Sequence, residues 1–100
     1  MADAILTFDS IYENFMNGSY KENEKDFKDK LYDYVNTKTF VFKSAIIKEP
    51  TKWLGKILMA IEIGMMIDKD IFIEFRNHWK QLLNKDWVVS LEDKWIVWKD

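Results

Sequence analysis

The C-terminal segment from Trp87 onward constrains the fold more than any other part of the chain. Two runs rich in β-branched and aromatic residues flank an acidic pair at positions 92–93, a pattern that predicts a β-hairpin. If the acidic pair forms a two-residue loop, Trp87 lies opposite Trp98. Val89 then lies opposite Ile96, and the register of the hairpin follows.

Both faces of this predicted hairpin are apolar. Leu91 joins the face that carries Trp87, and the other face is formed by Val88, Trp95 and Val97. A small domain usually covers only one face of a hairpin, so the second face is a candidate surface for a partner. Coverage of that face by the N-terminal helix is the alternative. The candidate partner-binding residues are Trp95, Val97, Trp98 and Val88.

Composition predicts a single globular domain that spans residues 1–100. The chain is 48% hydrophobic and 16% aromatic, which is typical of a packed core. It has no cysteine, which excludes disulfides, thiolate metal sites and cysteine nucleophiles. No basic region precedes an apolar stretch at the N-terminus, and the apolar run 57–67 contains Glu62 and is too short for a bilayer. We therefore expect a soluble, cytoplasmic protein without a membrane partner.

Two helices are predicted in the N-terminal half. Apolar residues recur at helical spacing over residues 4–16, and Asn17-Gly18 ends that helix. Ser19 and Glu22 have the spacing of a capping box that opens a second helix. The exposed face of the second helix alternates lysines with carboxylates, as expected of a solvated, self-paired surface.

A strand and two more helices are predicted before the hairpin. Residues 40–47 are predicted to be a strand, and the helix that follows, residues 51–67, is apolar almost all round and therefore buried. A Met-rich groove on that helix is the alternative, formed by Met59, Met65 and Met66. Asp68 is expected to cap a fourth helix, residues 71–84. Its predicted buried stripe is Ile71, Phe72, Phe75, Trp79, Leu82 and Leu83, and its predicted water-facing residues are Glu74, Arg76, Asn77, Lys80 and Gln81.

The expected fold class is α+β, with about four helices packed on a small antiparallel sheet made of the C-terminal hairpin and the central strand. The order of elements over residues 20–98 resembles a winged-helix domain with the wing tip at residues 91–94. That resemblance implies that the helix before the hairpin enters the major groove of DNA. The candidate DNA-binding residues under this alternative are Arg76, Lys80 and Lys69.

The charge pattern disfavours nucleic acid as the partner. Net charge is −2, only one of the fifteen basic residues is an arginine, and the would-be wing carries Glu92 and Asp93. Neutralisation of several phosphates is the main source of affinity for DNA, and acidic residues at the wing oppose it.

Catalytic signatures are missing from the sequence. The single histidine, His78, follows Glu74 by one helical turn and is interpreted as a histidine beside an acidic neighbour. No glycine-rich phosphate loop, nucleophile elbow or calcium loop is present. We expect no enzyme, no catalytic residues, no cofactor and no metal site.

Protein–protein recognition is the class of function that remains. Five Trp, four Tyr and seven Phe supply the residue types that dominate interfaces. A composition rich in Lys, Ile and Asn but poor in Arg follows AT-rich codons, which suggests a low-GC bacterium or its phage. We expect a non-enzymatic module that binds a host or cognate protein, as a small phage or mobile-element inhibitor or modulator of a bacterial complex, of the anti-defence or host-takeover type. The alternatives are a winged-helix transcriptional regulator and a homo-oligomeric structural or accessory protein.

Overall fold

The computed structural model describes residues 7–42 and 52–99. Four α-helices pack with a two-stranded antiparallel sheet, and the expected α+β class is confirmed. The elements are α1 (Phe8–Met16), the 3₁₀ helix η1 (Ser19–Asn23), α2 (Glu24–Phe42), α3 (Lys52–Ile67), α4 (Lys69–Leu83), β1 (Asp86–Ser90) and β2 (Trp95–Lys99).

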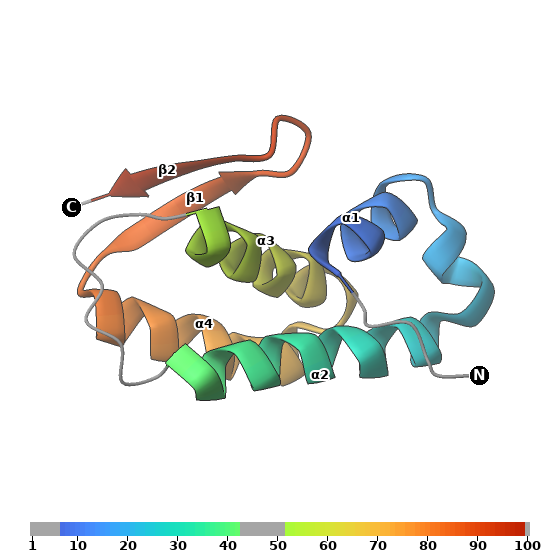
Figure 1. Ribbon diagram of the computed structural model, residues 1–100, viewed down its shortest axis with the longest axis horizontal. Coiled ribbons are helices and arrows are strands. Elements are labelled where there is room, and N and C mark those ends of the chain that lie inside the picture. The colour runs from blue at the N-terminus through green and yellow to red at the C-terminus, as the bar shows by residue number, and fades with distance from the viewer. Residues whose placement is uncertain (1–6, 43–51, 100) are drawn as a thin grey trace.

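Helix α3 lies at the centre of the molecule, between the hairpin on one side and α2 and α4 on the other (Figure 1). It contacts α1, α2, α4 and both strands. Because neighbours surround it, most of its described apolar side chains are buried, as predicted. The fully buried ones are Leu54, Ile57, Leu58, Ala60, Ile61 and Ile63.

The methionines of α3 do not form a common groove. Met59 is buried in the core, whereas Met66 is 69% exposed near the C-terminal end of the helix. A side chain buried in the core and one that is mostly in water do not line one groove, so the alternative of a Met-rich groove has no geometric basis here.

Gly64 allows α3 and α4 to approach closely. A Cβ atom at this position would lie 2.4 Å from Cδ1 of Phe72, well inside van der Waals contact. Phe72 is fully buried against this site. The glycine is therefore required by packing, and it fixes how α4 folds back along α3.

The predicted strand at residues 40–47 is wrong in its first part. Helix α2 continues through Phe42, and residues 43–47 lie outside the described residues. The buried stripe of α2 extends one turn further than expected, to Thr39, whose hydroxyl accepts a hydrogen bond of 2.9 Å from Nε1 of Trp79. This tertiary contact overrides the β-propensity of the segment that follows. In the part of the chain that the structure describes, the sheet consists of the hairpin alone.

The link between α1 and α2 also differs from expectation. Gly18 adopts the left-handed conformation predicted for it, with φ of 82°. The residues after it form η1 instead of a capping box, and the hydroxyl of Ser19 donates to Oδ1 of Asn14 at 3.0 Å. Oδ1 of Asn23 accepts from the N–H of Asp26 at 3.3 Å and so caps the start of α2.

Two other helix starts are defined by their caps. Helix α1 begins after Thr7, whose Oγ1 accepts from the N–H of Ser10 at 3.2 Å, and the earlier predicted residues 4–6 lie outside the described part. Asp68 precedes α4 as expected, but its side chain makes no capping bond. It forms an ion pair with Lys28 of α2 instead, at 3.4 Å.

The buried stripe of α4 is narrower than the sequence predicts. Phe72 and Trp79 are fully buried, and Phe75 and Leu83 pack partly against the core. Ile71 and Leu82, each 38% exposed, lie at the border of the stripe.

Candidate functional site

The hairpin has the predicted register but a longer turn. Trp87 lies opposite Trp98, and Val89 lies opposite Ile96, which confirms both pairings. The strands are joined by residues 91–94 instead of a two-residue loop. Lys94 has a φ of 51°, and its N–H donates to the carbonyl of Leu91 at 3.4 Å. Both loops are centred between residues 92 and 93, so the register is the same.

One face of the hairpin, which we call the inner face, packs on the helical core. Trp87 is only 2% exposed, and its ring meets the ring of Trp98 edge-on, with 6.2 Å between centroids. Val89, Leu91 and Ile96 are partly buried against the same core. The indole Nε1 of Trp87 is buried and has no hydrogen-bond partner in the described structure. The burial of so much apolar area outweighs the cost of that single N–H group.

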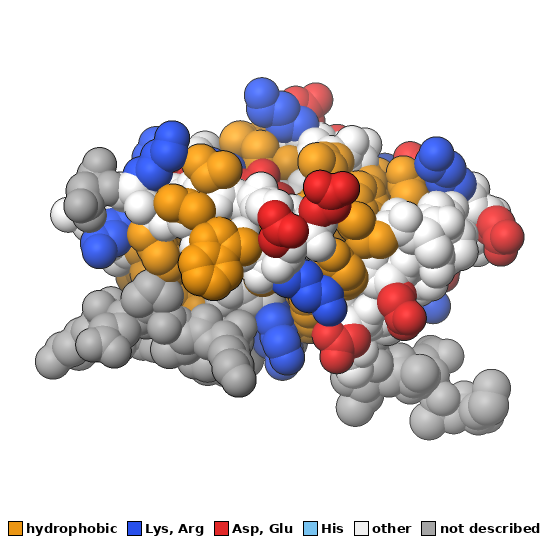
Figure 2. Space-filling model, turned by 90° about the horizontal axis from the view of Figure 1, so that it is seen from above, with side chains coloured by type: hydrophobic (Ala, Val, Ile, Leu, Met, Phe, Trp, Pro, Cys, Tyr) orange, Lys and Arg blue, Asp and Glu red, His pale blue; other side chains and the backbone are white. Residues whose placement is uncertain are grey.

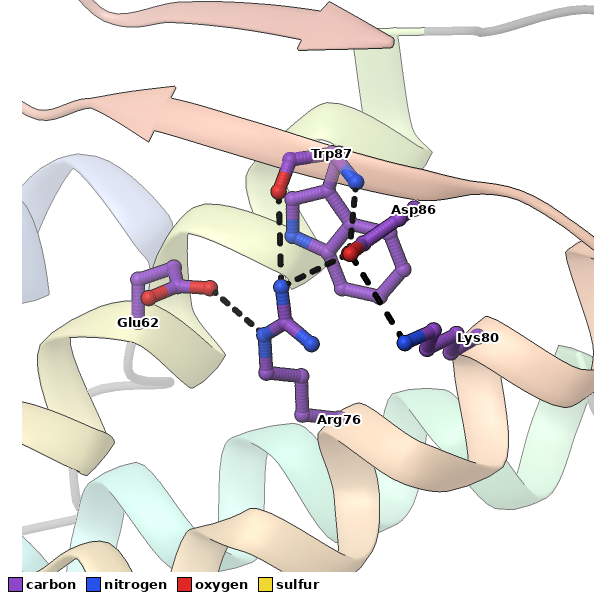
Figure 3. A network of polar contacts seen from close by, with 5 residues as sticks. All are labelled: Glu62, Arg76, Lys80, Asp86 and Trp87. Carbon is purple, nitrogen blue, oxygen red and sulfur yellow. Dashed lines mark hydrogen bonds and ion pairs between the residues drawn. The ribbon is translucent and has the colours of Figure 1, made fainter. Parts of the chain in front are cut away.

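Arg76 fastens β1 to α3 and α4 (Figure 3). Its Nη2 lies 2.8 Å from Oδ1 of Asp86 on β1, and its Nε lies 3.2 Å from Oε1 of Glu62 on α3. The guanidinium carbon is 4.8 Å from the ring centroid of Trp87, within the range of a cation–π contact. The Arg76 side chain is only 19% exposed, so the prediction that it faces water is wrong. A lone arginine among lysines is a signal for such a role, because the planar guanidinium serves several partners at once.

Asp86 is the acidic centre of this network. Its Oδ1 accepts from the N–H of Trp87 at 2.8 Å, and its Oδ2 lies 3.7 Å from Nζ of Lys80. The hydrogen bond from Trp87, followed by the one from Arg76, lowers the pKa of the Asp86 carboxyl. The carboxylate therefore stays ionised at neutral pH.

Helix α1 holds the turn of the hairpin. The hydroxyl of Tyr12 donates to the carbonyl of Leu91 and, at 3.4 Å, to that of Glu92. Nζ of Lys94 lies 4.4 Å from the centroid of the Tyr12 ring. The described part of this helix contacts the turn, and the second hairpin face, which carries Trp95, stays exposed, so the alternative in which the helix covers that face is wrong. Tyr12 belongs to the apolar stripe of the predicted helix 4–16, and no local signal identifies its distant partner.

The opposite face of the hairpin, which we call the outer face, is open. Trp95 is 62% exposed, Val97 50% and Val88 48%, and Val88 and Val97 are cross-strand partners. Seen from above, the surface of the molecule carries hydrophobic side chains interspersed with lysines and carboxylates (Figure 2). The structure thus brings together three of the four predicted partner-binding residues. The fourth, Trp98, lies on the inner face against Trp87.

The three candidate DNA-binding residues do not form a free basic surface. Arg76 is held by Glu62 and Asp86, and Lys80 shares the same Asp86. Lys69 is exposed at the start of α4, next to acidic residues on either side in the sequence. Cations that already pair with carboxylates of the protein contribute less to the neutralisation of DNA phosphates.

The described residues offer no cluster of metal ligands. They contain no group of three His, Asp or Glu side chains arranged to hold a metal ion. His78 is exposed, with its ring edge-on to Trp79 at 6.0 Å between centroids. None of the described helices has the length and apolar character needed to cross a bilayer.

Comparison with protein-family models, curated proteins and solved structures gives no match for this chain.

Proposed function

We propose that this protein is a non-enzymatic binding module that contacts a protein partner through the outer face of its hairpin. The observation that carries the proposal is the 62% exposure of Trp95 beside the half-exposed pair of Val88 and Val97 on the same face. Tryptophan is enriched among the residues that dominate binding energy, especially where aliphatic neighbours exclude water around it.

The anchoring of the inner face supports this proposal. Trp87 is buried, Arg76 ties β1 to two helices and Tyr12 ties the turn to α1. A surface held in place in this way loses little conformational entropy when a partner docks, so more of the contact energy appears as affinity. The charged side chains at the turn, Glu92, Asp93 and Lys94, are exposed and suited to steering the encounter.

The proposed source of the protein and the proposed kind of partner follow from its composition. A small, arginine-poor chain of AT-rich codon bias suits a phage or mobile-element inhibitor. The partner we propose is accordingly a protein of a bacterial host complex.

Site-specific photo-crosslinking tests the proposal. A photoreactive phenylalanine analogue replaces Trp95 in one variant and Met66 in a control, because Met66 is also exposed but lies on α3. We expect a covalent adduct with one protein at position 95 and none at position 66. Trp95→Ala should then weaken the affinity for that protein by about thirtyfold, as is typical of an interface hot spot, while Met66→Ala leaves it unchanged. Equal labelling at both positions, or no labelling at position 95, would contradict the proposal.

A further inference from the structure

The two edges of the hairpin differ in how their backbone groups are satisfied. On β1, the N–H of Trp87 donates to Oδ1 of Asp86 at 2.8 Å, and its carbonyl accepts from Nη2 of Arg76 at 3.4 Å. Both groups are therefore directed away from β2. In an antiparallel ladder this identifies Trp87 and Trp98 as a non-hydrogen-bonded pair.

Alternation along the ladder then fixes the other strand. Val88 pairs with Val97 by backbone hydrogen bonds, whereas Ile96 and Trp98 direct their N–H and carbonyl groups toward the far edge of β2. In the described part of the chain, no partner is found for those four groups. The edge of β2 is thus a row of unsatisfied donors and acceptors.

Strand β2 also lacks the usual protection of an edge strand. It contains no proline, its five pairs with β1 run without a bulge, and its only charged residue is Lys99 at the end. Proteins that must avoid pairing at an edge protect it with prolines, bulges or several charged side chains. An unprotected edge is a template for another strand.

We propose that β2 pairs with β2 of a second copy of this chain, antiparallel, about a two-fold axis at Val97. In this register Ile96 of each copy lies opposite Trp98 of the other copy. All four outward backbone groups of each strand then find partners. A shift by two residues in either direction leaves one residue of each strand without its backbone partner inside β2.

The side chains in this register complement one another. Trp95 lies opposite Lys99 of the second copy, a cation–π pair, and Val97 lies opposite its own equivalent. Like charges do not meet anywhere along the pairing. This self-complementarity favours a second copy of the chain over an unrelated strand.

The resulting assembly is a four-stranded sheet with the helices of both copies on one side. Because the pairing strands have only five residues each, we expect the interface to be smaller than the roughly 800 Å² per partner of a stable complex, and the dimer to be weak. The inference concerns the edge of β2 and stands independently of the partner proposed for the outer face.

Sedimentation equilibrium of the full chain over a roughly hundredfold range of concentration, up to about 1 mM, tests the inference in the weak-affinity range expected of small interfaces. We expect the mass to rise from 12.1 kDa toward twice that value. Val97→Lys places two ammonium groups at the two-fold axis and should weaken dimerisation at least about fivefold. Val88→Lys is the matched control, because Val88 is equally exposed on the same face but lies on β1.

A change in the backbone tests the pairing of the two β2 strands without altering any side chain. N-methylation of Trp98 by semisynthesis deletes an outward N–H and leaves the ladder with β1 intact, so the dimer should be lost while the circular dichroism spectrum of the folded chain is retained. N-methylation of Val89, whose N–H points to the edge of β1, should leave the dimer unchanged. A mass of 12.1 kDa at every concentration, equal effects of Val88→Lys and Val97→Lys, or an unaffected dimer after N-methylation of Trp98 would overturn the inference.

Discussion

Trp87 and Trp95 belong to the same hairpin, yet one is 2% and the other 62% exposed. The inner face that carries Trp87 meets α3, Arg76 of α4 and, at the turn, Tyr12 of α1. No described element covers the outer face around Trp95 to the same degree. The difference lies in the neighbours, since both residues are tryptophans in strands of equal length. One face is therefore packed on the core, and the other is exposed to solvent.

Replacement of Trp87 on the inner face should have the largest effect on the free energy of unfolding. We expect Trp87→Ala to lower the free energy of unfolding by about 3–5 kcal/mol, because it leaves a large cavity at a fully buried aromatic site. Trp95→Ala should change it by less than about 1 kcal/mol, since the side chain is mostly in water. Urea denaturation of both variants measures the difference, and equal losses would show that the two faces are not energetically distinct.

Removal of Arg76 tests how the inner face is held. Arg76→Met keeps the aliphatic stem but leaves Glu62 and Asp86 without their common partner, and we expect a loss of about 1–3 kcal/mol in the free energy of unfolding. Lys80→Met is the control, because its 3.7 Å contact with Asp86 is largely exposed and should contribute less than about 1 kcal/mol. Urea denaturation provides both values. A loss no larger than that of the control would mean that Arg76 is dispensable for anchoring β1.

Acid should weaken the contacts of Asp86 with Arg76 and the backbone, and we expect this to be the smallest of the three effects on the free energy of unfolding. The pKa of Asp86 is lowered in the folded state, so its contribution to stability is complete above its unfolded pKa of about 3.9 and is lost as the pH falls through its lower folded value. Asp86→Asn should therefore be less stable than the wild type at neutral pH, with a gap that narrows below about pH 4. Urea denaturation at a series of pH values measures this gap. A constant gap from neutral pH to strong acid would exclude a contribution from the charge of Asp86.

Much of the fold is predictable from the sequence. The period of the apolar residues locates the helices, and the alternation around the acidic turn gives the pairing of Trp87 with Trp98. Prediction fails where a contact between residues far apart in the sequence determines where an element ends. Helix α2 extends through Phe42 beyond the buried hydrogen bond between Trp79 and Thr39, which no local pattern contains.

The candidate site is predictable only in part. Val88, Trp95 and Val97 were predicted to share a face, and they do, because side chains alternate along a strand. Trp98 was grouped with them but lies on the inner face by the same alternation. Arg76 was expected in water, yet its partners Glu62 and Asp86 come from two other elements.

The sequence by itself determines the positions of α1, α3 and α4, the register of the hairpin and the composition of its two apolar faces, because all of these depend on local spacing. Only the tertiary structure decides which face is buried. Both faces are hydrophobic enough to pack on a core, so the choice depends on where α3 presents its apolar surface and on where Arg76 and Tyr12 find backbone and carboxylate partners on β1 and at the turn. These contacts join residues far apart in the chain, and local spacing carries no information about them.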